Sequence, residues 1–314
     1  MSPTKCKIKG VGSYFPKLVV PNKQIASAVG SSDEWVREKL GIKQRHFVNI
    51  DERASDLGFR AALDALSSAN MKVDDIDLII AVTSSPDRIS PSTACLIHEK
   101  LSPAKPIPAF DINAVCTGFL YALEVASPLC EKYNNILVVA AETYSRWTDF
   151  TSKNCVFFGD GAGAVVLTKS DTGWYYGNVF ADGSGKENFT LRHNHSFSMK
   201  PKEVYRVGTT VLPESINQVL SYLSMTIDDI DYFVPHQPSF RILLKTAATI
   251  GLPKDKIVMN MDKRGNTAGA SIPTALDSLL AHTPLKDNDK ILFAAVGSGW
   301  TWGAGVMNWR SSDE

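Results

Sequence analysis

The feature that most constrains this chain is an internal repeat. VDDID occupies residues 73–77 and is followed by LIIAV, while IDDID occupies residues 227–231, 154 positions later, and is followed by YFVPH. Upstream of each pentapeptide, apolar residues recur at helical spacing and end at a polar turn. The same order of helix, turn and strand at two places predicts two similar folding units.

Two further pairs of segments extend the repeat. NILVVAAE at 135–142 parallels KILFAAVG at 290–297, and FGDGAGAVVL at 158–167 resembles WTWGAGVMNW at 300–309. Continuous apolar runs such as ILVVAA are typical of strands buried on both faces of a sheet that helices cover. We therefore predict two α/β halves, residues 1–170 and 171–314, with a boundary near residues 169–173. The alternative is a chance likeness between short apolar strands.

The composition excludes several classes of protein. The chain carries 33 basic and 33 acidic residues, so no field of one sign attracts nucleic acid or an anionic membrane. No apolar run reaches the roughly 18 residues that a membrane-spanning helix needs. The first 16 residues hold no long apolar core like that of a signal peptide. We expect a soluble, cytoplasmic protein that binds neither nucleic acid nor membranes.

The cysteines argue against two kinds of site. There are five, an odd number, and none belongs to a CxxC pair. This pattern fits neither a disulfide framework nor a zinc site. We expect free thiols and no bound metal.

One cysteine occupies a position where a nucleophile is plausible on chemical grounds. Cys116 follows the predicted strand PIPAFDIN and precedes an apolar run at helical spacing, so it lies at or next to a helix start. Unpaired N–H groups and the helix dipole there favour a thiolate, which predicts a lowered pKa. A small residue packed against Gly118 explains the same pattern equally well.

Three features of the second half also follow predicted strands or precede a helix. His236 ends the strand YFVPH, Asn266 lies ahead of a helix that starts near Ser271, and Ser298 lies in a glycine-rich turn after KILFAAVG. Taken singly, the histidine fits a core hydrogen bond and the asparagine a turn or helix cap. Ligands of α/β sheets bind beyond the carboxyl ends of the strands. A thiol, an imidazole and an amide donor sharing one pocket would form a catalytic site.

The same stretches carry a resemblance to a known family. Five segments carry it: DINAVCTGFLYAL, FGDGAGAVVL, PHQPSFRI, GNTAGASIPTAL and GSGWTWGAG. A sixth, SSDEWVREKLGIKQRHF, lies near the start. Together they resemble β-ketoacyl-acyl carrier protein synthase III of the thiolase superfamily. The resemblance runs from about Ile8 to Trp309. It implies an α/β, thiolase-like fold of two βαβαβαββ halves in five layers (αβαβα), in a homodimer.

The resemblance also implies a reaction and its residues. Cys116 is the nucleophile that accepts an acyl group, and the backbone N–H groups of Cys116 and Ser298 form the oxyanion hole. Nε2–H of His236 and the side-chain N–H of Asn266 promote decarboxylation of a malonyl thioester. The expected activity is a decarboxylating Claisen condensation, in fatty-acid initiation or a specialised pathway. Coenzyme A or phosphopantetheine thioesters are its substrates, with no separate cofactor.

Substrate contacts follow from the resemblance position by position. Trp35 matches a tryptophan that contacts the coenzyme A adenine in the family. Lys39 and Lys153 replace arginines, so the positive charge remains but the planar guanidinium group is lost. Ser239 stands where the family usually holds the pantetheine arm with asparagine. Pro201 lies in a substrate-facing loop that usually contains glycine.

Two further regions concern the partner subunit and the carrier. Ser90 is small and lies in a loop that caps the partner subunit's acyl pocket in the family, which favours primers longer than acetyl. The positions that match the surface for acidic acyl carrier protein are Arg206, Arg241 and Lys245.

Two other functions stay open at this point. An acyltransferase of the same fold would use Cys116 to pass acyl groups to an oxygen or nitrogen acceptor without condensation. A degenerate subunit would only hold a dimer or bind the carrier. Release of carbon dioxide from a malonyl thioester distinguishes the condensing enzyme from the acyltransferase.

Overall fold

Two β-sheets form the framework of the structure, a computed structural model that describes residues 2–191 and 197–310. The first sheet has the order β1-β7-β6-β4-β5, and the second has the order β11-β12-β13-β8. The first comprises β1 (Cys6–Tyr14), β4 (Leu78–Val82), β5 (Ala109–Ile112), β6 (Asn135–Glu142) and β7 (Gly161–Lys169). The second comprises β8 (Trp174–Ala181), β11 (Tyr232–Pro235), β12 (Lys290–Gly297) and β13 (Thr301–Asn308).

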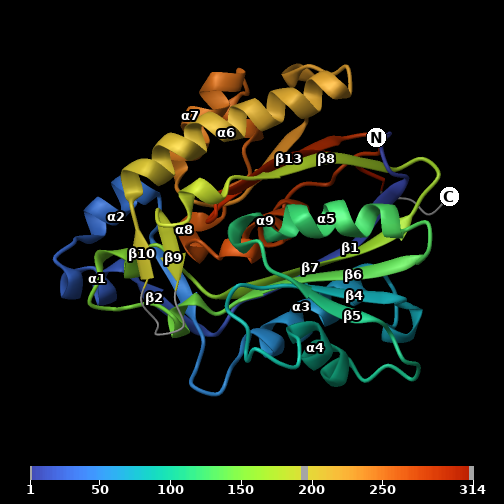
Figure 1. Ribbon diagram of the computed structural model, residues 1–314, viewed down its shortest axis with the longest axis horizontal. Helices are drawn as coiled ribbons and strands as arrows, with labels where there is room; N and C mark the ends of the chain where they lie inside the picture. The colour runs from blue at the N-terminus through green and yellow to red at the C-terminus, as the bar shows by residue number, and fades with distance from the viewer. Residues whose placement is uncertain (1, 192–196, 311–314) are drawn as a thin grey trace.

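Helices cover both faces of each sheet and complete five layers (Figure 1). Two helices lie between the sheets and contact strands of both, and one further pair covers each outer face. The inner helices are α5 (Gly118–Leu129) and α9 (Ser271–Leu280). The outer pairs are α3 (Ala54–Ser68) with α4 (Thr93–Leu101), and α6 (Pro201–Tyr222) with α7 (Phe240–Ile250). The predicted thiolase-like layering is confirmed.

The repeated pentapeptides perform the same structural task in each half. Asp77 accepts a hydrogen bond from Asn135 N at 3.2 Å, and Asp231 accepts one from Lys290 N at 2.8 Å. Each aspartate thus binds the first residue of the strand that runs parallel to its own, β6 in the first half and β12 in the second. The repeat marks the points where these parallel pairs begin.

The two halves differ at the position of the fifth strand. Where β5 pairs with β4 in the first sheet, the second has a single parallel bridge between Ile257 and Phe233. Beside this bridge, the side chain of Gln237 bonds to backbone groups that a longer strand pair would use: its amide nitrogen donates to Val258 O at 3.1 Å, and its amide oxygen accepts from Asn260 N at 3.2 Å. The sequence pattern alone did not predict this shortening.

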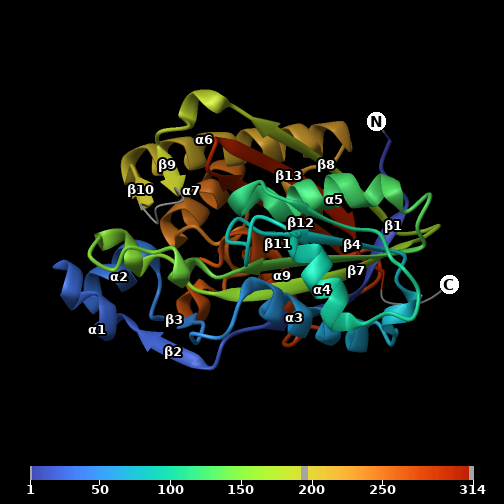
Figure 2. The same ribbon diagram turned by 60° about the horizontal axis from the view of Figure 1, so that its bottom comes forward.

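Smaller elements gather at the end of the molecule that holds the cavity described below (Figure 2). They are the antiparallel pair β2 (Leu18–Pro21) and β3 (Gln44–Phe47), the pair β9 (Phe189–Leu191) and β10 (Phe197–Met199), and helices α1 (Asn22–Ile25), α2 (Asp33–Leu40) and α8 (Met261–Arg264). Among the described residues, no helix is long and apolar enough to cross a bilayer.

Candidate active site

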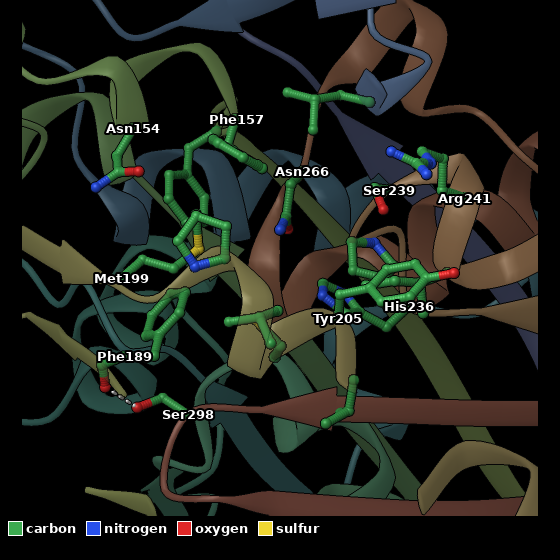
Figure 3. Close-up of a pocket in the computed structure, with 18 of the residues that line it drawn as sticks. Asn154, Phe157, Phe189, Met199, Tyr205, His236, Ser239, Arg241, Asn266 and Ser298 are labelled. Carbon is green, nitrogen blue, oxygen red and sulfur yellow. Dashed lines mark hydrogen bonds between the residues drawn. The ribbon is translucent and has the colours of Figure 1, made fainter. Parts of the chain in front are cut away.

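One cavity of about 580 Å³ receives residues from both halves of the chain. Cys116 enters it from the turn after β5, His236 from the end of β11, and Asn266 from the loop before α9. Figure 3 shows Asn266 and His236 with the aromatic residues that surround the same space. The structure therefore brings the three predicted chemical groups together, as the repeated-half architecture requires.

Cys116 lies in a single 3-10 turn, Val115–Thr117, directly ahead of α5. This position agrees with the expected helix start, but the expected fall in its pKa is wrong. Burial raises the pKa of the Cys116 thiol, and the negative charge of Glu142 raises it further. The thiol, in a side chain that is 4% exposed, is therefore protonated at neutral pH and needs a base.

The glycine-rich turn after β12 packs directly against the backbone of the cysteine. A Cβ added at Gly297 would lie 3.2 Å from Cys116 N and 2.9 Å from Thr117 Oγ1, so a side chain would crowd this contact. Ser298, the next residue, also lines the cavity. The two backbone segments predicted to form an oxyanion hole are thus neighbours.

Hydrogen bonds fix the orientation and the tautomer of His236. Its Nδ1 lies 2.7 Å from Ser271 Oγ, and that hydroxyl lies 2.7 Å from the carbonyl oxygen of Ala268. The carbonyl can only accept, so Ser271 donates its single proton to Ala268 O and accepts from Nδ1–H. Burial lowers the pKa of His236 to about 3, which keeps the ring neutral. In this arrangement Nε2 carries a lone pair. The Nε2–H donor expected from the sequence stays a prediction.

Replacing Ser271 with alanine should release this tautomer. Without the hydroxyl, Nδ1 loses its 2.7 Å partner, and more of the ring will carry its proton on Nε2. We expect acylation of Cys116 to slow about tenfold, the effect of one lost hydrogen bond. Nitrogen-15 NMR of His236 measures the tautomer directly, and Ser271→Thr, which retains a hydroxyl, is the control. An unchanged Nδ1–H signal in the alanine variant would show that Ser271 does not set the tautomer.

The side chain of Asn266 is oriented by its own loop. Its Oδ1 accepts a hydrogen bond from Ala268 N at 2.8 Å, so the amide nitrogen is the group left for a ligand. Its backbone N–H donates to Phe157 O at 2.9 Å, and its carbonyl accepts from Gly159 N at 3.0 Å. These bonds join the loop of the second half to a segment of the first and place an amide donor in the cavity.

A buried carboxyl beside Cys116 was not predicted from the sequence. Glu142 ends β6 and accepts hydrogen bonds from Ser84 N, Ser84 Oγ (2.9 Å) and Ser85 Oγ (2.5 Å). Burial raises its pKa to about 7, and the serine bonds oppose this shift only in part. An acidic residue ending the apolar run ILVVAA is the signal that would have identified it.

Glu142 should make stability depend on pH. In the unfolded chain it loses its proton near pH 4.5, whereas in the folded protein it keeps the proton up to about pH 7. The folded state binds the extra proton in this window, so stability falls as pH rises through it. Relative to Glu142→Gln, we expect the wild-type free energy of unfolding to fall by roughly 2–3 kcal/mol between pH 5 and pH 8. Urea unfolding at both pH values measures this, and parallel pH profiles would contradict the assignment.

Apolar side chains form the wall of the cavity around the sulfur. Cys116 belongs to a buried cluster with Tyr144, Phe158, Phe189 and Ala268. Phe158 stacks on Tyr144 with ring centroids 4.6 Å apart and meets Phe189 edge-on at 6.2 Å. None of these aromatic residues was predicted as a site residue, because only the tertiary structure brings them to Cys116. The wall suits an acyl chain.

The rim of the cavity carries five of the predicted contacts. Four were predicted for the substrate, namely Trp35, Lys39, Lys153 and Ser239, and Arg241 was predicted for the carrier protein. Sequence reasoning missed Lys202, a cation that also lines the cavity and follows Pro201, which lines it as well. The rim therefore combines one half-exposed tryptophan with several cations, a composition that suits an anionic ligand with a flat ring.

Three predicted residues lie outside the cavity. Ser90 is in the exposed loop between β4 and α4, and Lys245 is exposed on α7. Arg206 is exposed on α6 and pairs with Glu203 at 2.8 Å, so much of its charge is already compensated. The described ranges contain no cluster of three or more histidine, cysteine or acidic residues arranged to hold a metal ion.

The fold and the site define a class of protein: a thiolase-fold enzyme with a buried cysteine and a histidine and asparagine from the opposite half. Two family models match, 3-oxoacyl-[acyl-carrier-protein (ACP)] synthase III over residues 110–184 and its C-terminal part over residues 220–309. The chain belongs to the β-ketoacyl-acyl carrier protein synthase III family and is an enzyme of that type.

Individual relatives agree over nearly the whole chain. The beta-ketoacyl-[acyl-carrier-protein] synthase III of Clostridium acetobutylicum is 39% identical, over 96% of this chain and 98% of the relative. The crystal structure of 3-oxoacyl-[acyl-carrier-protein] synthase III from Aquifex aeolicus is 37% identical with a TM-score of 0.93, covering 97% of this chain and all of the other. The priming β-ketosynthase of the R1128 polyketide pathway is 27% identical with a TM-score of 0.91, covering 99% of each chain. These matches support condensation over simple acyl transfer.

Proposed function

We propose that this enzyme transfers an acyl group from a thioester to Cys116 and condenses it with a malonyl thioester, releasing carbon dioxide. The observation that carries the proposal is the shared cavity, which is lined by a thiol from one half and by a neutral imidazole and an amide donor from the other. The first half-reaction makes the enzyme an acyltransferase.

Acylation requires removal of the thiol proton. The lone pair on Nε2 of His236 accepts this proton as the sulfur of Cys116 attacks the thioester carbonyl. The new oxyanion accepts hydrogen bonds from the backbone N–H groups of Cys116 and Ser298. The carbon–sulfur bond of the donor then breaks, its electron pair leaves on the thiolate, and Nε2–H returns the proton to it. The products are an acyl-cysteine, a free carrier thiol and a neutral histidine.

Decarboxylation requires a donor for the enolate oxygen and no base for a C–H proton. When the malonyl carboxylate leaves as carbon dioxide, the electron pair moves onto the thioester oxygen, where the side-chain N–H of Asn266 stabilises it. The complete reaction consumes one proton. That proton can bind to Nε2 of His236, where the resulting N–H is a second hydrogen-bond donor to the enolate oxygen. It can then pass to the Cys116 thiolate.

Condensation completes the cycle at the same oxyanion site. The enolate carbon attacks the acyl carbonyl on Cys116, and the tetrahedral oxyanion again accepts hydrogen bonds from the backbone N–H groups of Cys116 and Ser298. The bond from carbon to the cysteine sulfur then breaks and releases a β-ketoacyl thioester. The buried aromatic wall around the sulfur keeps water from the acyl-cysteine, which favours condensation over hydrolysis.

The rim supports coenzyme A and phosphopantetheine thioesters as substrates. Lys39, Lys153 and Lys202 can bind phosphates, Trp35 offers a ring face for an adenine, and the hydroxyl of Ser239 can bind a pantetheine arm. Arg241, on α7 with Lys245, is suited to an acidic acyl carrier protein. We expect a homodimer, because β5 ends its sheet as an edge strand and exposes Phe110.

Intact-protein mass spectrometry tests the donor and the primer together. The enzyme is incubated with acetyl to decanoyl groups, each as a coenzyme A and as an acyl carrier protein thioester. We expect one added acyl mass per chain, fastest for the preferred primer, and blocked by prior alkylation of Cys116. Failure of every thioester in the panel to add a mass would overturn the proposal.

A further inference from the structure

The side chain of Ser298 joins the oxyanion turn to the wall of the acyl pocket. Its hydroxyl donates a hydrogen bond to the carbonyl oxygen of Phe189, the first residue of β9, at 2.6 Å, and Figure 3 shows this bond as a dashed line. The two residues are 109 positions apart in the chain. The hydroxyl thus points at β9, while the backbone N–H of the same residue belongs to the predicted oxyanion hole.

Phe189 is the residue of β9 that lines the cavity. Its ring lines the cavity, is buried with Cys116 in one cluster, and meets Phe158 edge-on. Across the hairpin it stands opposite Met199, which lines the same cavity. The backbone position of β9 therefore sets how much room an acyl chain finds beside the sulfur.

A chain of hydroxyl contacts continues from Ser298 toward the nucleophile. Thr301 Oγ1 donates to Ser298 O at 3.1 Å and lies 2.9 Å from Thr117 Oγ1, in the residue that follows Cys116. The backbone of Trp300, in the same turn, exchanges two hydrogen bonds with Asp182, on the segment that leads to β9. The oxyanion turn is thus bonded to β9 through Ser298 and to the segment between β8 and β9 through Trp300.

We propose that Ser298 is a specificity-determining residue, whose hydroxyl holds Phe189 against the acyl pocket and so excludes long primers. An acyl chain that needs more room must move β9, which strains the turn that carries the oxyanion donor. Long primers therefore bind more weakly and also acylate Cys116 more slowly once bound. This inference rests on the proposed acyl-Cys116 intermediate.

Ser298→Ala and Ser298→Gly test the inference as a matched pair. Both keep the backbone N–H and remove the hydroxyl, but only the glycine variant also loosens the backbone. The ratio of decanoyl to acetyl transfer onto Cys116, measured by rapid-quench mass spectrometry, is expected to rise about five- to tenfold in both, the effect of one hydrogen bond. Ser298→Thr, which keeps a hydroxyl, should retain the wild-type ratio.

Phe189→Ala supplies an independent measurement. It should raise the same ratio, and combining it with Ser298→Ala should add little, since the two changes act on one wall. A wild-type ratio in Ser298→Ala, or a rise confined to Ser298→Gly, would overturn the inference. Absence of any acyl mass on wild-type Cys116 would instead overturn the proposed function, so the two failures are distinguishable.

Discussion

Replacing Cys116 with alanine is expected to abolish acyl transfer to the protein and to lower overall turnover by at least roughly 10⁴-fold. The cavity receives one thiol, and in the described ranges the other cysteines lie elsewhere: Cys6, Cys130 and Cys155 are buried outside it, and Cys95 is exposed. No other side chain of the site can form a thioester. Intact-protein mass spectrometry with an acyl thioester measures the loss directly.

Two further variants make this result specific. Cys95→Ala removes the exposed thiol and should leave acyl uptake at the wild-type level, because Cys95 is remote from the cavity. Cys116→Ser keeps a hydroxyl of similar size but is a much poorer nucleophile, so uptake should remain at least a hundredfold below wild type. An acyl mass that persists in Cys116→Ala would assign the nucleophile to another residue.

Replacing Asn266 with alanine is expected to separate the two half-reactions. Loss of the amide donor should slow decarboxylation of the malonyl thioester by about 10²–10³-fold, the usual effect of removing one oxyanion donor. Acylation of Cys116 should change little, because Asn266 takes no part in removing the thiol proton. Carbon dioxide release and acyl uptake are measured on the same preparation.

His236→Ala is the informative comparison for this prediction. Because Nε2 of His236 accepts the thiol proton in the proposed mechanism, loss of the imidazole should slow acylation as well as decarboxylation. Asn266→Asp, which keeps the shape but replaces the donor with an acceptor, should be at least as impaired in decarboxylation as the alanine variant. Equal loss of acylation in the asparagine and histidine variants would refute the division of roles.

The sequence predicted those parts of the fold that local patterns determine. The duplicated aspartates, the buried strands and the helix starting at Ser271 follow from spacing and residue type, and the structure contains each of them. The boundary assigned near residues 169–173 stays a prediction, although β7 ends at Lys169 and β8 begins at Trp174. The second sheet has a single bridge where the first has β5, and no local pattern in the sequence predicted that difference.

The site was predictable in its residues but not in its protons. Motif positions predicted Cys116, His236 and Asn266, which the structure brings to one cavity, but the protonation of Cys116 and His236 depends on burial and on partners distant in sequence. The pKa of Cys116 rises because the tertiary structure excludes water and places Glu142 nearby. The tautomer of His236 depends on Ser271, 35 positions away. The hydroxyl bond of Ser298 to β9 likewise joins segments that no local pattern connects.

A single-turnover experiment tests the central claim most directly, namely that the two halves enclose one cavity where an acyl-cysteine meets a decarboxylating malonyl group. Enzyme carrying an acyl group on Cys116, freed of donor, is mixed with a malonyl thioester, and acyl mass, carbon dioxide and products are followed in time. We expect the acyl mass to disappear as equal amounts of carbon dioxide and a β-ketoacyl thioester form. Loss of the acyl mass to water or another acceptor, without carbon dioxide, would contradict the account.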